Sequence, residues 1–132
     1  MSDQLRPATR LATTDHSDDD LVLVDAARQA YVGFPIAVAV TAAAWADTVT
    51  WHAEDMDRHP AAVDDGPERL LRLLMHALPA WSQCRGASVV FSLERVRRDG
   101  PPNTVSTVRL MITPSATSMG LPLAVIALLG EH

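Results

Sequence analysis

The spacing of hydrophobic and polar residues changes along the chain, from helical periods in the first two thirds to alternation in the last third. The clearest helical signal lies between residues 70 and 81, where apolar residues recur every three or four positions. Asp65 and Glu68 precede it as a capping box, and Pro79 is expected to end or kink the helix. The predicted buried face is Leu70, Leu74, Leu78 and Trp81, and the predicted solvated stripe is Arg69, Arg72 and His76.

Two shorter helices are predicted before this one. Asp25 can cap a helix over residues 26–32, which Gly33 would end. Thr41 can cap a second helix over residues 42–58, which would end before Pro60. One face of this second helix would carry Trp45, Val49, His52 and Met56.

Strands are predicted at both ends of the domain. Residues 21–24 form a short apolar run, and residues 34–40 alternate loosely around Pro35, which favours extended or edge structure. In the last third, apolar and polar residues alternate over residues 89–94 and again over residues 108–112, with a turn at residues 98–102 between them. A polar loop over 113–120 and an apolar run over 121–129 complete the pattern. We therefore expect an α+β domain, with a three-stranded antiparallel C-terminal meander packed against two or three helices.

Length and composition favour a single domain without a membrane span. The chain has 132 residues, and we interpret residues 1–20 as a flexible tail and residues 21–132 as the domain. The most apolar stretch, residues 34–46, is too short to cross a bilayer, and no signal peptide is visible. Cys84 is the only cysteine, so an intramolecular disulfide is excluded and a cytoplasmic location is expected.

Charge is divided between two regions of the sequence. The net charge of −5 argues against a general nucleic-acid binder. Residues 41–68 hold seven acidic residues and one arginine, whereas residues 69–110 hold seven arginines and two acidic residues. Such a layout suits recognition of a partner, although two solvated faces of an ordinary domain would have the same composition.

Two histidines and a carboxylate are candidates for a metal site. On a helix, His52, Asp55 and His59 would stand at i, i+3 and i+7, with ligand types that bind divalent metals. The alternative is a solvated, acidic helix end. A zinc deaminase site at His52 and Glu54 is excluded, because it needs a second cysteine.

Two further groups carry weaker candidate chemistry. Cys84 beside Arg85 could serve as a nucleophile with His76 as its base, or could be an inert packing residue. Four arginines on or beside the C-terminal hairpin could bind nucleic acid or, with few aromatic residues nearby, could be solvated or bind acidic groups. Of these, we expect three to share one face of the sheet and Arg98 to lie at the turn; the three are Arg95, Arg97 and Arg109.

Several segments of the chain together match one family pattern: Leu23-Val24-Asp25, Ala30, Gly33-Phe34, Val38 to Thr41, Ala44-Trp45, Asp47, Val49, Trp51, Glu54-Asp55, Arg69-Leu70, Phe91, Arg98-Asp99-Gly100 and the apolar strand before the acidic C-terminus. On these segments, residues 21–132 resemble an uncharacterised bacterial family of unknown function found in actinobacteria, plasmids and other mobile elements. The first third carries the specific part of the resemblance, and the later segments are weaker. The family pattern has a proline where Ala37 stands, whereas this chain has Pro35, and His52 and His59 lie outside the pattern. The resemblance implies no catalytic residue and suggests accessory cargo of mobile elements.

These observations predict a small non-enzymatic protein without a cofactor that binds another protein, as an anti-defence factor of the anti-CRISPR or anti-restriction type. The partner would be a nucleic-acid-binding host complex, and direct nucleic-acid binding is not expected. The alternative is a small metal-binding protein or enzyme that uses His52, Asp55 and His59. A homodimer, joined through sheet edges or a helix, is a third possibility. The expected partner-binding residues are Glu54, Asp55, Asp57, Asp64 and Asp65.

Overall fold

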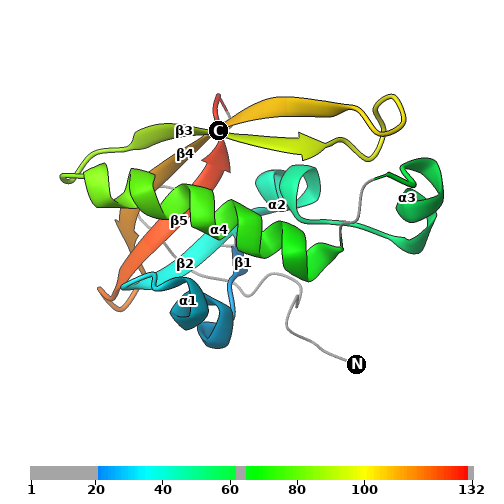
Figure 1. Cartoon of the computed structure of the whole chain (residues 1–132). Coiled ribbons are helices and arrows are strands. Elements are labelled where there is room, and N and C mark those ends of the chain that lie inside the picture. Colours follow the sequence, from blue (N-terminus) through cyan, green and yellow to red (C-terminus); the bar gives the residue numbers. More distant parts are fainter. Residues whose placement is uncertain (1–20, 62–64, 131–132) are drawn as a thin grey trace.

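A computed structural model of the chain describes residues 21–61 and 65–130, so the predicted tail lies outside the described residues. Within them, five strands and four helices follow the order β1–α1–β2–α2–α3–α4–β3–β4–β5 (Figure 1). The strands are β1 (Leu21–Leu23), β2 (Ala37–Thr41), β3 (Val89–Val96), β4 (Val105–Ala116) and β5 (Pro122–Leu128). The helices are α1 (Ala26–Val32), α2 (Ala42–Thr48), α3 (Ala53–Arg58) and α4 (Gly66–Gln83).

The strands form one mixed sheet in the order β1-β2-β5-β4-β3. β3, β4 and β5 are antiparallel neighbours, as the alternation predicts. The expectation of a three-stranded antiparallel sheet is nevertheless wrong, because β2 adds in parallel beside β5 and β1 pairs with β2. Residues 34–40 are predicted to be extended or at an edge: the chain is extended there as β2, but β2 lies between two strands rather than at an edge, and Pro35 precedes it.

Local capping signals place α1 where the sequence predicts it. The Asp25 carboxylate accepts a hydrogen bond from the Arg28 amide at 2.9 Å, which satisfies a free N–H of the first turn. Gly33 ends the helix in the left-handed conformation at φ 86°, which glycine adopts without steric penalty. The fold predicted for residues 25–33 is therefore confirmed.

The predicted helix over residues 42–58 is wrong, because the chain forms two short helices there. α2 ends at Thr48, whose hydroxyl donates to the Ala44 carbonyl, and residues 49–52 leave the helical path. The run of β-branched residues at 48–50 has low helix propensity, and a new cap at residue 52 starts α3. The predicted stripe is therefore divided, with His52 and Met56 exposed.

α4 begins as predicted and continues further than predicted. Asp65 caps it by accepting from the Glu68 amide at 2.8 Å. Pro79 lies inside the helix on its exposed side, where it removes one backbone hydrogen bond without ending the helix. Arg69 is 1% exposed, so its predicted place on the solvated stripe is wrong.

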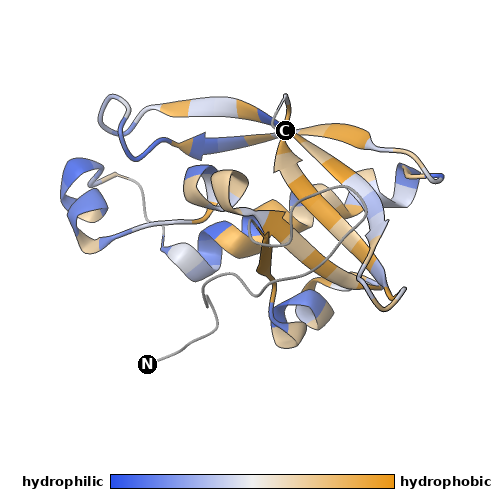
Figure 2. Cartoon of the chain, turned by 180° about the vertical axis from the view of Figure 1, so that it is seen from behind, coloured by the Kyte–Doolittle hydropathy of each residue, from blue (hydrophilic) through white to orange (hydrophobic). Residues whose placement is uncertain are grey.

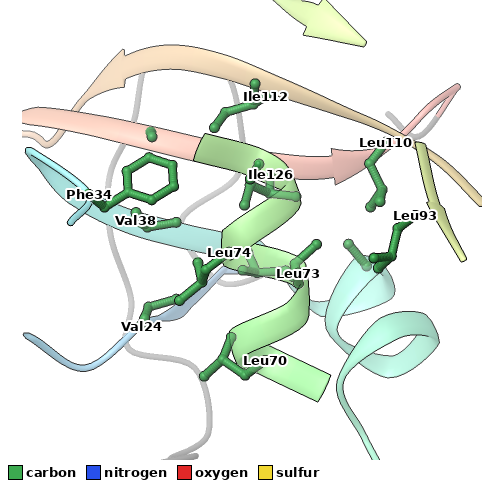
Figure 3. Close-up of a cluster of buried hydrophobic side chains, with 14 of the residues drawn as sticks. Val24, Phe34, Val38, Leu70, Leu73, Leu74, Leu93, Leu110, Ile112 and Ile126 are labelled. Atoms are coloured by element: carbon green, nitrogen blue, oxygen red, sulfur yellow. The ribbon is translucent and has the colours of Figure 1, made fainter. Parts of the chain in front are cut away.

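α4 crosses one face of the sheet and forms the main core with it (Figure 3). Leu73 and Leu74 of α4 meet Val38, Leu110 and Ile126 from the strands. A second, smaller cluster is made of strand residues only, and it includes Leu21, Ala39, Leu123 and Val125. In residues 21–61 and 65–130, no helix combines the length and apolarity that a bilayer span requires.

Candidate functional site

α3 and the loop between β3 and β4 lie together beyond one end of α4, and we call residues 51–61 and 97–104 the polar lobe (Figure 1). Figure 2 shows this part coloured as hydrophilic, in contrast to the apolar central strands. Within α3, Asp55 is the buried residue, whereas Met56 is 54% exposed. The lobe therefore holds its shape through polar contacts more than through burial of apolar side chains.

Asp55 starts α3 and ties it to the loop. One of its carboxylate oxygens accepts from the His52 amide and from Arg98 Nε, both at 2.7 Å. Burial alone raises the pKa of Asp55, but these hydrogen bonds and the Arg98 charge outweigh burial and hold the pKa below its usual value of 3.8. Asp55 is 4% exposed, and its negative charge is compensated within the chain by the Arg98 guanidinium.

His59 ends α3 and bridges the loop with both ring nitrogens. Its Nδ1 accepts from the Asn103 amide at 3.0 Å, so its Nε2 carries the proton that is donated to the Arg98 carbonyl at 3.1 Å. The side chain is fully buried. Because both nitrogens are used by backbone groups, His59 acts as a bridge between two segments that are about 40 residues apart in the sequence.

Further polar contacts join the two segments of the lobe, residues 51–61 and 97–104. Arg58 donates to the carbonyls of Asp99 and Gly100 at 3.4 and 3.3 Å, and the Ala61 amide donates to Asn103 Oδ1 at 2.7 Å. Asn103 has a positive φ of 57°, which asparagine tolerates better than most residues. The loop conformation is thus matched to the residues of α3.

A buried arginine of α4 contacts the tryptophan at the start of the lobe. Arg69 donates to the carbonyls of Val96 and Asp47, both at 3.2 Å, and its guanidinium lies 4.6 Å from the Trp51 ring centroid. The Trp51 ring also lies 5.7 Å from that of His59. Arg69 therefore connects α4 to α2, to β3 and to the first residue of the lobe.

A second ion pair links α2 to the hairpin. Arg95 contacts both carboxylate oxygens of Asp47, at 2.6 and 3.1 Å, and also donates to the Ser106 carbonyl and hydroxyl. This bidentate geometry is the favourable one for arginine and a carboxylate. The acidic and arginine-rich regions of the sequence thus neutralise each other in part, through Asp47–Arg95 and Asp55–Arg98.

An open cleft of about 660 Å³ lies between α2, α3 and the β3–β4 loop. Its apolar lining residues are Ala43, Ala46 and Leu128. The lining carries charges of both signs, and its charged residues are Asp47, Glu54, Asp55, Arg58, Arg97, Arg98 and Asp99. Such a surface can hold a partner segment that carries both an acidic and a basic group.

The predicted acidic surface is only partly available to a partner. Glu54 and Asp57 are exposed on α3, and Glu54 lines the cleft. Asp55 is buried in its contact with Arg98, and Asp65 is exposed but caps α4. Asp64 lies outside the described residues.

The predicted metal ligands do not converge on a common point. His52 is exposed at the start of α3, Asp55 is paired with Arg98, and both nitrogens of His59 contact backbone groups. In the part of the chain that the structure describes, no group of three or more histidine, cysteine or acidic side chains is arranged to hold a metal ion. The geometry therefore gives no support to the alternative function that depends on these three residues.

Cys84 and His76 are each engaged locally. Burial raises the pKa of the Cys84 thiol, which lies 3.6 Å from the Ala80 carbonyl. His76 is exposed, and its Nδ1 donates to the Arg72 carbonyl at 2.9 Å. A raised thiol pKa is the opposite of what a thiolate nucleophile needs, so the packing interpretation is favoured.

The predicted arginine face of the hairpin is wrong. Arg95 pairs with Ser106 and Ser92 pairs with Arg109, so Arg95 and Arg109 point to opposite faces of the sheet. Arg95 and Arg98 bind Asp47 and Asp55, as the acid-binding interpretation predicts. Of the four arginines, Arg97 and Arg109 are the exposed ones.

Sequence reasoning missed the residues that build the lobe: His59 as a bridge, Arg69 as a buried cation, and Asn103. One signal for Arg69 was available, because it directly precedes Leu70 in a helix whose apolar face is wide. His59 and Asn103 are 44 positions apart, and no local pattern relates them.

Known proteins offer no guide to the role of this cleft. Comparison of the chain with known protein families, curated proteins and solved structures gives no significant match. These comparisons therefore transfer no function to the chain.

Proposed function

We propose that this chain is a small non-enzymatic protein that acts by binding another protein, and that the polar lobe and its cleft form the contact surface. The observation that carries the proposal is the open cleft of about 660 Å³, which is lined by a few apolar residues and by charged residues of both signs. Its described lining residues include no histidine, cysteine or serine, and Asp47 and Asp55 are held by arginines. This chemistry suits recognition better than covalent or general-base catalysis.

Within the cleft region, the exposed charges would meet the partner. Glu54 and Asp57 on α3 are exposed, and Arg97 has a side chain that is 55% exposed. Charges at the rim of an interface mainly steer association and select partners, so binding should weaken as salt rises. We assign Asp55 to holding the lobe together, since its carboxylate already accepts from Arg98.

The resemblance to a family carried by mobile elements supports a narrower proposal for the partner. A nucleic-acid-binding complex of a host defence system, of the CRISPR or restriction type, presents basic surfaces that an acidic helix such as α3 can occupy. The net charge of −5 is small for a protein that imitates DNA by charge alone. We therefore propose a specific protein contact at the lobe rather than a general electrostatic decoy.

The test compares two charge-reversal variants in capture from the native host followed by mass spectrometry. Glu54→Arg with Asp57→Arg should reduce affinity for the protein captured by the parent chain by about tenfold or more at low salt. The matched control, Glu68→Arg with Glu94→Arg, changes the same charge at exposed sites outside the lobe and should retain binding. Equal affinity of both variants at low salt would contradict the assignment of the lobe as the contact surface. Capture of the same partner by a chain with a disrupted lobe would do the same.

A further inference from the structure

One arginine of the polar lobe is held in a fixed position and also lines the open cleft. The Arg98 carbonyl accepts from His59 Nε2 at 3.1 Å, which fixes its backbone. Arg98 Nε donates to the buried Asp55 carboxylate at 2.7 Å, which fixes the orientation of its side chain. The side chain nevertheless remains 31% exposed, and it lines the cleft together with Glu54 and Arg58. Arg98 is therefore preorganised at the proposed contact surface.

Most of the hydrogen-bonding capacity of the Arg98 guanidinium is not used by the described part of the chain. A guanidinium carries five N–H donors, one on Nε and two on each Nη atom. The contact with Asp55 uses the donor on Nε. Within residues 21–61 and 65–130, no group accepts a hydrogen bond from Nη1 or Nη2 of Arg98. The donors on these two atoms therefore remain for water or for a bound group.

A partner that covers the cleft has to supply acceptors for these donors. Water can bond to the Nη atoms while the cleft is open, but an interface removes this water, and a charged donor without an acceptor then weakens association. A carboxylate is the matching acceptor, because its two oxygens align with two parallel N–H bonds of a guanidinium. The fixed position of Arg98 also reduces the entropy that such a contact loses on binding.

The charge balance of the cleft favours a single carboxylate over a row of phosphates. Two of its acidic residues are already paired, Asp47 with Arg95 and Asp55 with Arg98. The charged lining residues outside these pairs are Glu54, Asp99, Arg58 and Arg97. Their charges balance, whereas a nucleic-acid backbone binds where an excess of positive charge neutralises its phosphates. One carboxylate needs only the guanidinium that the cleft already presents.

We propose that Arg98 binds the carboxylate of an acidic side chain of the partner protein, through Nη1 and Nη2. This inference rests on the proposed function and names the group that enters the cleft. Arg58 provides a second contact, because it is exposed in the same cleft. Its hydrogen bonds to the carbonyls of Asp99 and Gly100 are long, at 3.4 and 3.3 Å, so little is lost when Arg58 turns toward the bound carboxylate.

Two peptides that differ in one group test this site in the full chain, without the partner. The probes are Ala-Ala-Glu-Ala-Ala and Ala-Ala-Gln-Ala-Ala, both acetylated and amidated, and each is titrated at constant ionic strength. The glutamate peptide should shift the NMR signal of Arg98 Cζ, and it should leave the signal of Arg109, which is exposed outside the cleft, unchanged. Equal shifts at the two arginines, or equal shifts with the two peptides, would overturn the proposal.

Inorganic phosphate at the same ionic strength distinguishes the two kinds of anion. Because the charges of the cleft balance, phosphate should shift the Arg98 signal less than the glutamate peptide does. A larger shift with phosphate would assign Arg98 to a phosphate group and would also overturn the proposal.

A pair of matched variants tests the same site with the captured partner. Arg98→Lys keeps a positive charge beside Asp55 but lacks the paired N–H groups of a guanidinium, so its affinity should fall about tenfold. Arg109→Lys makes the same change outside the cleft and should bind like the parent chain. Exchange of the His59 amide shows whether the lobe stays closed in Arg98→Lys, and if it opens, the peptide titration of the parent chain decides.

The two variants also separate this inference from the proposed function. If Arg98→Lys and Arg109→Lys bound the partner equally, while Glu54→Arg with Asp57→Arg lost it, the carboxylate site would be wrong and the lobe would remain the contact surface. If the charge reversal at Glu54 and Asp57 had no effect, the proposed contact surface itself would be wrong.

Discussion

The core around α4 and the polar lobe around α3 are stabilised in different ways. α4 has seven buried residues, most of them leucine or alanine, which pack on the strands of the sheet. α3 has one buried residue, Asp55, and contacts the β3–β4 loop through hydrogen bonds and an ion pair. Apolar burial is non-directional and tolerates small changes in geometry. Polar contacts of buried groups, in contrast, depend on their geometry and protonation state. The core should therefore determine the free energy of global unfolding, and local opening of the lobe should require less free energy than global unfolding.

The fold also changes how the separate acidic and basic regions of the sequence are distributed on the molecule. Separate acidic and basic regions of the sequence predict separate surfaces, but the fold brings them together at Asp47–Arg95 and Asp55–Arg98. The acidic and basic residues that remain exposed on the lobe are Glu54, Asp57, Arg58, Arg97 and Asp99, because Asp55 and Arg98 pair with each other. Partner recognition, as proposed here, thus depends on a small set of side chains held by a polar framework.

The largest expected effect comes from a cavity in the core. Leu73→Ala should lower the free energy of unfolding by about 3 kcal/mol, because it removes a fully buried side chain between α4 and the sheet. Urea unfolding followed by circular dichroism measures this loss. Met75→Ala, at a position on α4 that is 62% exposed, is the matched control and should change stability by less than about 0.5 kcal/mol. If both variants lost the same stability, the core would not have the dominant role assigned to it.

A smaller and more local effect is expected in the lobe. Asp55→Asn keeps an acceptor for the His52 amide but removes the charge that pairs with Arg98. The free energy of opening of the lobe should fall by about 1 kcal/mol. The amides of His59 and Asn103, which bond within the lobe, should then exchange with solvent about fivefold faster, whereas the Val24 amide in the core should not change. Equal acceleration at Val24 would show that the lobe and the core open together.

Acid should weaken the lobe through the same carboxyl group. Because the folded pKa of Asp55 lies below 3.8, the unfolded lobe binds more protons in this range, and stability rises with pH. The contribution is complete above pH 3.8 and is lost as the pH falls through the folded pKa. Hydrogen exchange of the His59 amide at several pH values below about 5 measures it.

The matched control for the acid effect lies in α1. Asp25 also has a lowered pKa: burial alone raises it, but hydrogen bonds from the Arg28 amide and side chain outweigh burial. Asp25→Asn should therefore leave the pH dependence of the lobe unchanged, whereas Asp55→Asn should remove it. A lobe that keeps its pH dependence in Asp55→Asn would require another titrating group.

Local signals predict the elements of the core better than those of the lobe. The cap at Asp25, the stop at Gly33 and the cap at Asp65 act within four residues, so they can be recognised without knowledge of the fold. The apolar run of β5 is typical of a strand buried on both faces, which β5 is, whereas the looser pattern before β2 did not indicate that β2 is buried in the same way. Their parallel pairing was not predicted, because period alone does not identify a strand's neighbour.

The candidate site was harder to predict for a physical reason. The β-branched residues 48–50 are a local signal for the division of the predicted helix over residues 42–58, but the position of α3 depends on contacts with a loop about 40 residues away. The burial of Arg69 likewise depends on the carbonyls of Asp47 and Val96, which reach it only in the folded chain. Such long-range polar contacts have no periodic signature in the sequence.

The smallest expected effect sharpens the distinction between charges that hold the lobe and charges that are exposed for a partner. Arg97 lies 3.4 Å from Asp99, with side chains that are 55% and 78% exposed. Exposed pairs of this kind contribute little, so Arg97→Ala should change the free energy of unfolding by less than about 0.5 kcal/mol and leave the exchange of the His59 amide unchanged. Urea unfolding and hydrogen exchange measure both quantities. Since Arg97 also lines the cleft, the same variant should weaken binding of the captured partner at low salt. A loss of lobe protection in Arg97→Ala would place Arg97 in the framework with Arg98 and remove it from the proposed contact surface.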